Sequence, residues 1–135
     1  MPRTRVLLAD DNALVADQIR DLLAESFDVV GVVSSGEELE TAFEALAPEV
    51  VVTDVAMPGK GGFLAARQVL ARQPATAVVL LSVIDDSPII RASLSAGVKG
   101  YVVKDDAADE LVQAIEAVLD GEWYVSATGR RALSP

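Results

Sequence analysis

The sequence predicts a doubly wound α/β fold built on a five-stranded parallel sheet. Short runs rich in valine and leucine alternate five times with amphipathic segments. Four of these runs are almost continuously apolar, which is typical of parallel strands buried on both faces. The chain has 135 residues, 51% of them hydrophobic, so it is long enough for one domain with a sizeable core.

The predicted strands are short, and polar or glycine-containing segments end them. In chain order they are Val6–Ala9, Val29–Val33, Val50–Val52, Val78–Leu81 and Gly100–Val103.

The first two predicted helices follow the first two strands. Leu14, Ile19 and Leu23 recur on one face of the first, which indicates an amphipathic helix. The second begins at Ser35, and Glu38 stands three residues later. This spacing is that of a capping box, which satisfies free N–H groups at a helix start.

The remaining three helices follow the last three strands. The third comes after a glycine-rich loop at residues 58–62. The fourth begins at Ser87-Pro88, where serine is expected as the N-cap and proline as the first helical residue. The fifth carries an apolar stripe that includes Leu111 and Ile115, and acidic residues in its first turn suit the helix dipole.

Composition excludes several classes of function. The chain contains no cysteine and no histidine, which excludes disulfides, thiolate nucleophiles, Cys/His zinc sites and histidine acid–base catalysis. Its net charge of −10 disfavours direct binding of this domain to nucleic acid. The longest segment without a charged side chain, residues 73–84, is too short to span a bilayer. We therefore expect a cytoplasmic domain without a membrane partner.

Five polar side chains stand where four of the predicted strands end. Asp10 and Asp11 follow the first strand, Asp54 the third, Ser82 the fourth and Lys104 the fifth. The carboxyl ends of parallel strands meet at one edge of the sheet, where α/β proteins gather their functional groups. Each residue alone is ordinary, since Asp pairs also occur at 85–86 and 105–106, but their joint placement predicts a single site.

This set of groups suits phosphoryl transfer. Carboxylates held together repel each other, and one pair ~4 Å apart costs on the order of 4 kcal/mol at an effective dielectric near 20. Mg²⁺ relieves such repulsion, because it binds through a few carboxylates, waters and phosphate oxygens. One carboxylate can then attack phosphorus, since the reaction depends mainly on positioning and on neutralising the phosphoryl oxygens. Lys104 offers a positive charge to one such oxygen and Ser82 a hydroxyl to another.

Over about residues 5–120 the chain closely resembles the receiver domain of bacterial two-component response regulators. The resemblance rests on four motifs, which as a set are highly specific: Leu8–Asn12, Thr53–Gly59, Leu80–Ser82 and Gly97–Asp105. It implies the flavodoxin-like (βα)5 fold with strand order 2-1-3-4-5. It also implies a phosphorylation switch rather than an enzyme, one that catalyses only its own phosphorylation and slow dephosphorylation.

The resemblance assigns a role to each polar residue. Asp54 is the implied phosphoacceptor, which receives its phosphoryl group from a sensor histidine kinase. Asp10, Asp11, Asp54 and the backbone carbonyl of Ala56 are the implied ligands of Mg²⁺ or Mn²⁺.

Three further residues match the family's signalling positions. Ser82 and Lys104 take the places of the hydroxyl and the lysine that sense the phosphoryl group. Tyr101 matches the switch aromatic, whose ring changes its burial when the hydroxyl moves toward the phosphate.

Two stretches, Gly97–Asp105 and Gly121–Ser126, resemble the NarL/LuxR-type subfamily, whose members carry a helix-turn-helix DNA-binding domain downstream. We expect residues 1–120 to form the receiver domain and residues 121–135 to form a linker or frayed tail that leads to such a DNA-binding domain. Leu133–Pro135 is similar to the usual opening of that domain. DNA is therefore expected as a partner only through a domain outside this sequence.

Signal output, including a homodimer formed on phosphorylation, is expected at one of two faces. One consists of the fourth helix, fifth strand and fifth helix, and the other of the first and fifth helices. Ile89, Ile90 and Trp123 are candidate exposed contacts, although all three could equally be core residues.

Two positions depart from the family pattern. Val83 stands where the family usually has alanine or glycine, which leaves a path to the acceptor. Ala56 offers no polar side chain to orient an attacking water. Together they predict slow autodephosphorylation.

The sequence bears on three alternative functions. A binding module with the receiver fold but without phosphorylation remains open, although every expected chemical side chain is present. A phosphatase or mutase of the haloacid-dehalogenase type would need a second Asp two residues after the nucleophile, where this chain has Ala56. A flavin-binding flavodoxin is disfavoured because the acidic Asp10-Asp11-Asn12 loop would repel the cofactor phosphate.

Overall fold

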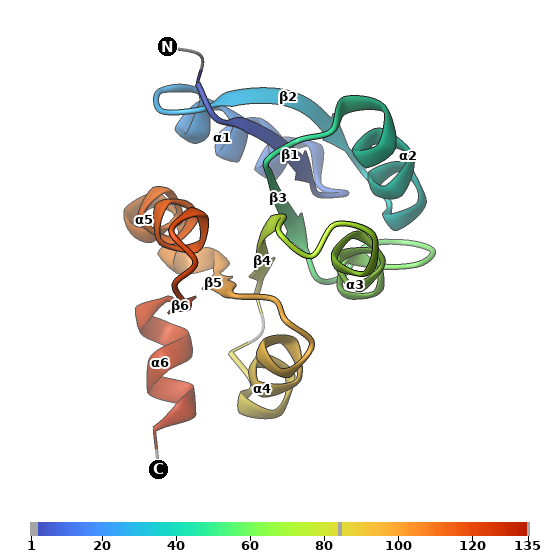
Figure 1. The fold of residues 1–135 in the computed structure, drawn as a ribbon. Coiled ribbons are helices and arrows are strands. Elements are labelled where there is room, and N and C mark those ends of the chain that lie inside the picture. Colours follow the sequence, from blue (N-terminus) through green and yellow to red (C-terminus); the bar gives the residue numbers. More distant parts are fainter. Residues whose placement is uncertain (1–2, 84, 135) are drawn as a thin grey trace.

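The computed structural model describes residues 3–83 and 85–134, so Pro135 of the Leu133–Pro135 tripeptide lies outside the described residues. Strands and helices alternate along the chain (Figure 1). In order they are β1 (Arg5–Ala9), α1 (Ala13–Ala24), β2 (Asp28–Val33), α2 (Gly36–Leu46), β3 (Val50–Asp54), α3 (Gly62–Arg72), β4 (Ala77–Ser82), α4 (Ser87–Ser95), β5 (Gly100–Val103), the 3₁₀ turn η1 (Lys104–Asp106), α5 (Ala107–Leu119), β6 (Tyr124–Val125) and α6 (Ala127–Leu133).

The strands form one parallel sheet in the order β2-β1-β3-β4-β5-β6. The predicted order 2-1-3-4-5 is confirmed, with a sixth strand added beside β5. The chain first runs outward from β1 to β2 and then continues from β3 on the other side of β1. The gap between the ends of β1 and β3 is therefore the topological switch point, where α/β sheets bind ligands.

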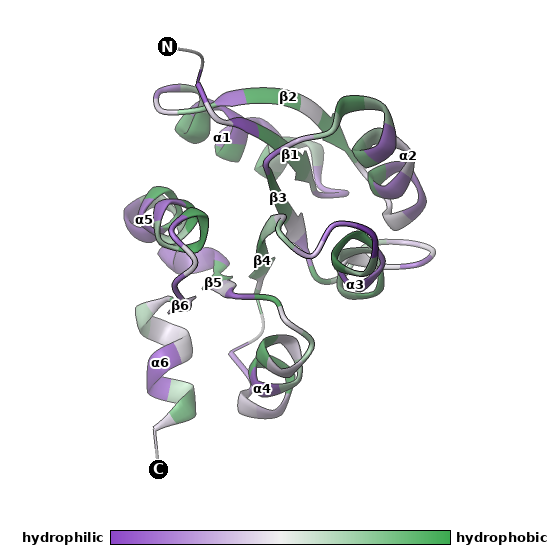
Figure 2. Cartoon of the chain, in the orientation of Figure 1, coloured by the Kyte–Doolittle hydropathy of each residue, from purple (hydrophilic) through white to green (hydrophobic). Residues whose placement is uncertain are grey.

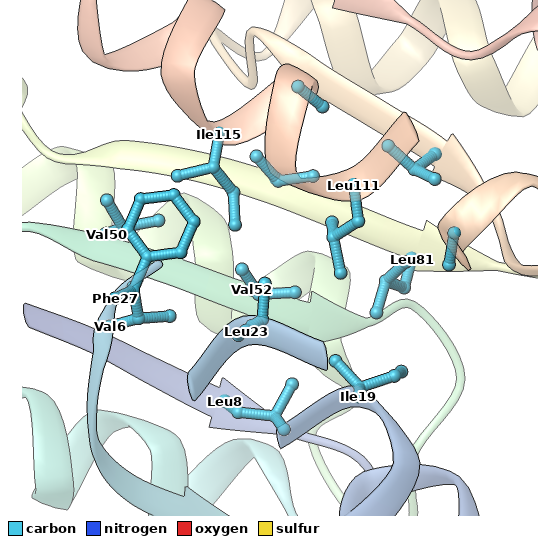
Figure 3. Packing of buried hydrophobic residues seen from close by; sticks show 14 of the residues in the cluster. Val6, Leu8, Ile19, Leu23, Phe27, Val50, Val52, Leu81, Leu111 and Ile115 are labelled. Carbon is cyan, nitrogen blue, oxygen red and sulfur yellow. The ribbon is translucent and has the colours of Figure 1, made fainter. Parts of the chain in front are cut away.

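Helices cover both faces of the sheet, which explains the continuous apolar strand runs. α1 and α5 lie on one face, while α2, α3 and α4 lie on the other (Figure 1). Successive side chains of a strand point to opposite faces. Thus Val6 and Leu8 belong to the core beneath α1 and α5, drawn in Figure 3, whereas Leu7 and Ala9 belong to the core beneath the other helices. The hydropathy colouring shows the same pattern, with apolar strands at the centre and polar outer helix faces (Figure 2).

The two predicted helix starts differ in outcome. The side chain of Ser35 caps α2 by accepting a hydrogen bond from the Glu38 N–H at 3.1 Å, as predicted. The prediction for α4 is wrong by one residue, because Asp86 is the N-cap and Ser87 is already helical. The Ser87 hydroxyl accepts a hydrogen bond from Arg91 instead of capping the helix.

Residues 121–134, for which the sequence predicts a linker or frayed tail, contain a short strand and a helix in the structure. β6 pairs with β5, and α6 packs beside α4 and β5. The Ser126 side chain is fully buried, and its hydroxyl accepts a hydrogen bond from the Val103 N–H at 2.9 Å. A two-residue strand is too short to show an alternating pattern, so nothing periodic in the sequence marked this segment.

Two carboxylates satisfy the N–H groups at the start of α6. Asp106 accepts hydrogen bonds from the N–H and the hydroxyl of Thr128, both at 2.9 Å. Glu110 accepts from the Ala127 N–H at 3.0 Å and from the Tyr124 hydroxyl at 2.7 Å. The free N–H groups of this helix end are thus paired with acids from η1 and α5 rather than with its own N-cap side chain.

The three candidate surface contacts have different environments. Ile90 is fully buried, because it faces the core between α4 and the sheet, so of the two possibilities left open for it the core position is the observed one. Ile89 is half-buried against the same core. Trp123 is 55% exposed, and the Lys99 ammonium lies 5.7 Å from the centre of its ring.

None of the described helices is long and apolar enough to cross a bilayer.

Candidate functional site

The predicted site residues meet at the switch point of the sheet. Asp10 directly follows β1, Asp54 is the last residue of β3, Ser82 ends β4 and Lys104 follows β5. Asp10, Asp11 and Asp54 each offer a carboxylate oxygen within 4.8 Å of the others. The sheet edge therefore brings together the three carboxylates that the sequence singled out.

Asp10 is held in a fixed orientation by the turn that follows β1. Its Oδ1 accepts a hydrogen bond from the Asn12 N–H at 2.9 Å, and the Asn12 side chain in turn caps α1 through the Val15 N–H. The Asp10 side chain is fully buried. Among the described residues, its Oδ2 is the buried side-chain oxygen that has no hydrogen-bond donor.

Asp54 is also buried, but it has two donors. Its Oδ1 accepts from the Ala56 N–H at 3.2 Å and its Oδ2 from the Lys104 ammonium at 2.9 Å. Burial raises the pKa of Asp54 above its usual value, while the hydrogen bond from Lys104 acts in the opposite direction. The carboxylate is thus less stable as an anion here than in water.

Lys104 bridges two carboxylates. Its Nζ lies 2.9 Å from Asp54 Oδ2 and 2.9 Å from Asp10 Oδ2, although the second contact is an ion pair without a well-aligned hydrogen bond. Burial acts to lower the pKa of Lys104, but the two carboxylates outweigh it and the pKa is raised. One ammonium among three carboxylates leaves two net negative charges at this edge.

These groups fit a divalent cation. Asp10 Oδ2 is buried without a hydrogen bond, and Asp11 is exposed beside it. Three oxygen donors close together, with an uncompensated charge of two, match the preference of Mg²⁺ for a few carboxylates. The Ala56 carbonyl as a fourth ligand stays a prediction.

The backbone after β3 is packed closely against Asp54. A Cβ added to Gly62, the first residue of α3, would lie 1.7 Å from the Asp54 carbonyl oxygen, so only glycine fits there. Thr53, buried under the same turn, donates its hydroxyl to that carbonyl at 3.0 Å. The strand end is thereby fixed in place from the α3 side.

Ser82 and Tyr101 connect this edge to the core under α4. Ser82 is buried at the end of β4, one residue beyond Leu81, which pairs with Asp54. The Tyr101 ring is fully buried. Burial raises the pKa of the Tyr101 hydroxyl, and a hydrogen bond with the Ser82 side chain opposes this rise. The two proposed switch residues are therefore in contact, with the ring inside the domain.

A family model described as the response regulator receiver domain matches residues 6–116. The chain belongs to the response regulator receiver domain family. As a receiver it is a signalling module rather than an enzyme that turns over an external substrate.

The chain is similar to other response regulators, one of which is described as belonging to the LuxR family. It is 40% identical to the response regulator GacA of Pseudomonas aeruginosa over 90% of this chain and 58% of GacA. The solved structure of a LuxR-family two-component response regulator from Aurantimonas matches this chain with a TM-score of 0.92 at 29% identity. The match covers 97% of this chain and 95% of that one. RcsB, in a structure of two dimers bound to DNA, matches with a TM-score of 0.88 at 26% identity. This match covers 97% of the present chain and 68% of the RcsB chain. The receiver thus spans less than two thirds of GacA's length.

Sequence reasoning identified the acidic and basic side chains of the receiver site but missed their backbone supports. Asn12 and Gly62 were not singled out, although an Asn before a helical pattern and a glycine directly after a loop are signals that could have indicated them. Val83, singled out for its size, is 77% exposed at the end of β4.

Proposed function

We propose that this receiver is a phosphorylation-activated switch of a two-component system, with Asp54 as phosphoacceptor and Mg²⁺ or Mn²⁺ as the metal. The observation that carries the proposal is the cluster of Asp10, Asp11 and Asp54 around a buried oxygen without a hydrogen-bond donor. The proposed phosphoryl donor is a sensor histidine kinase, and the proposed location of this receiver is the cytoplasm.

In the proposed reaction an oxygen of Asp54 attacks the phosphorus of a phosphohistidine. The new P–O bond forms as the P–N bond breaks, and the donor imidazole leaves with the electron pair. When bound, the metal would neutralise charge on the carboxylates and on a phosphoryl oxygen.

Lys104 and Ser82 would bind the phosphoryl group once it is on Asp54. The Lys104 ammonium already contacts Asp54 Oδ2, so a short movement would bring it to a phosphoryl oxygen. The Ser82 hydroxyl would exchange its partner Tyr101 for another such oxygen. Phosphorylation would then shift an existing equilibrium between two conformations, with Tyr101 as its reporter.

The proposed output is transcriptional control by a C-terminal DNA-binding domain, with a homodimer formed on phosphorylation. Support comes from the RcsB dimers bound to DNA and from GacA, of which this receiver covers 58%. The net charge of −10 supports assigning DNA contacts to another domain.

Intact-mass spectrometry after incubation with acetyl phosphate and Mg²⁺ tests the proposal. The expected result is one phosphoryl adduct that is lost in Asp54→Asn and in EDTA. Asp85→Asn, an exposed acid beyond the neighbouring strand, is the matched control and should keep the adduct. A folded wild-type protein without an adduct would instead support a binding module that works without phosphorylation.

A further inference from the structure

The loop between β3 and α3 is anchored to a helix on the other side of the site. Glu37, in the first turn of α2, accepts a hydrogen bond from the Lys60 N–H at 3.1 Å. Its carboxylate also lies against Gly59, where an added Cβ would be 2.7 Å from both carboxylate oxygens. This contact links residues that are 23 positions apart in the sequence.

A second acid of α2 holds the same loop. The Lys60 ammonium forms an ion pair with Glu40, and only 29% and 14% of the two side chains are exposed. The backbone joins this interface, because a Cβ added to Gly36 would lie 2.8 Å from the Gly61 carbonyl oxygen. One face of the first turns of α2 is thus occupied by residues 59–61.

The same loop also carries backbone groups of the phosphorylation site. At one end the Ala56 N–H donates to Asp54 Oδ1, and at the other the Gly62 N–H donates to the Val55 carbonyl at 3.0 Å. Gly59 has a φ of +73°, and because glycine adopts many backbone conformations readily, the loop keeps this one only if neighbouring groups constrain it. The α2 contacts supply that constraint in the middle of the loop.

We propose that Glu37 and Glu40 are positioning residues for the metal and phosphoryl site, acting through the β3–α3 loop on the backbone of Ala56. This inference rests on the proposed function, since it assumes that the loop takes part in metal binding. Neither glutamate touches Asp54. Each acts by keeping Lys60 against α2.

Four variants separate loop positioning from simple loss of charge. Glu37→Ala removes the acceptor for the Lys60 N–H, whereas Glu37→Gln removes the charge but keeps an acceptor oxygen. Glu40→Gln weakens the ion pair at constant size. Glu44→Ala is the matched control, because Glu44 lies on the same helix but pairs with Arg72 of α3 at 3.3 Å instead of with the loop.

Three measurements apply to each variant: backbone amide exchange of residues 55–61 without metal, Mn²⁺ affinity from electron paramagnetic resonance, and the Mg²⁺ dependence of phosphorylation by acetyl phosphate. Glu37→Ala should speed exchange in the loop but not in β3, and weaken Mn²⁺ binding on the order of tenfold. Glu40→Gln should shift both in the same direction, while Glu37→Gln and Glu44→Ala should stay close to wild type. Excess Mg²⁺ should restore phosphorylation of Glu37→Ala.

Unchanged loop exchange and Mn²⁺ affinity in Glu37→Ala would overturn the inference. Equal losses in Glu37→Ala and Glu37→Gln would also overturn it, because they would point to long-range charge. A wild-type protein that binds no Mn²⁺ and forms no adduct would instead refute the proposed function, so the two failures are distinguishable.

Discussion

The proposed phosphorylation site and the β6–α6 segment both contain carboxylates, but the hydrogen-bond donors around these carboxylates differ. At the site, Asp54 shares the Lys104 ammonium with Asp10, and burial raises its pKa. At the start of α6, burial acts on Asp106 in the same direction. There the Ser126 hydroxyl and the two donors of Thr128 outweigh burial, so the pKa of Asp106 is lowered.

This contrast indicates how the proposed phosphoacceptor differs from a carboxylate with a structural role in the same domain. Both acids lie at the carboxyl end of the sheet, within a few residues of β3 and β5. The number of donors aimed at each differs, rather than the residue type. Asp10 and Asp54 keep capacity for a cation, whereas Asp106 has used its oxygens to hold a helix.

The largest expected effect comes from removing the shared ammonium. Lys104→Met leaves two buried carboxylates without the ammonium that they share, so the free energy of unfolding in EDTA should fall by about 2 kcal/mol. This value is smaller than that for a fully buried ion pair, because the Lys104 side chain is partly exposed. Chemical denaturation with and without Mg²⁺ measures this. Mg²⁺ should stabilise the variant more than the wild type, and equal stabilisation would contradict a shared role for the two cations.

Removing a fully satisfied carboxylate should have a smaller and more local effect. Asp106→Ala deletes the two hydrogen bonds from Thr128 and the one from the Ser126 hydroxyl, which predicts a loss of about 1–1.5 kcal/mol and release of α6. Trypsin cleavage at Arg130 and Arg131 reports the release. Asp105→Ala, an exposed neighbour in the same turn, should leave cleavage slow. Protection of α6 in Asp106→Ala would show that Glu110 alone anchors the helix.

The two acids should also respond to pH in opposite ways, measured in EDTA. Because the pKa of Asp54 is higher in the folded than in the unfolded state, its ionisation lowers the free energy of unfolding at neutral pH. This loss disappears as the pH falls below the pKa of the folded state toward that of the unfolded state, near about 4. The lowered pKa of Asp106 adds stability above about pH 4, and this contribution is lost below that pH.

Asp54→Asn should therefore be more stable than wild type at pH 7, with the difference gone near pH 4. Asp106→Asn should be less stable at pH 7 and keep that deficit down to about pH 4. Denaturant titrations at several pH values compare them. If both variants changed the free energy of unfolding in the same direction at pH 7, the two carboxylates would not differ in the proposed way.

The smallest expected effect concerns the rim of the site. Val83→Ala should speed autodephosphorylation of the phosphorylated domain by on the order of threefold, which is under 1 kcal/mol of barrier. The reason is that a smaller side chain directly after Ser82 would leave more room for water to approach Asp54, and Val83 is exposed. The decay of the adduct, followed by intact mass, measures this. A wild-type lifetime of only seconds would contradict the prediction of slow loss.

The central fold was predictable because strand burial leaves a strong signal in the sequence. Runs such as Val50–Val52 must be apolar at every position when helices cover both faces, and they appear as strands within two residues of the expected bounds. The last two elements gave no such signal. Gly129 lies inside a seven-residue helix, where glycine is unfavourable by about 1 kcal/mol. Contacts with α4 and β5 and the carboxylates of Asp106 and Glu110 stabilise that helix.

The candidate site was predictable at the level of side chains and not at the level of donors. Topology alone brings Asp10, Asp54 and Lys104 to one edge of a parallel sheet. Turn geometry decides which carboxylate oxygen lacks a hydrogen-bond donor. For example, the Asn12 N–H donates to Asp10 Oδ1 and leaves Oδ2 without such a bond. The anchoring of the β3–α3 loop by Glu37 depends on packing between distant segments, for which a single sequence holds no pattern.

The position of Trp123 gives the domain a built-in optical probe. It is the single tryptophan of the chain, it stands directly before β6, and its indole is half exposed beside Lys99. Detachment of β6 and α6 would change the solvation of this indole, so emission from unlabelled protein would follow the segment in real time. The absence of cysteine also means that one introduced thiol would carry a single dye as an energy-transfer acceptor.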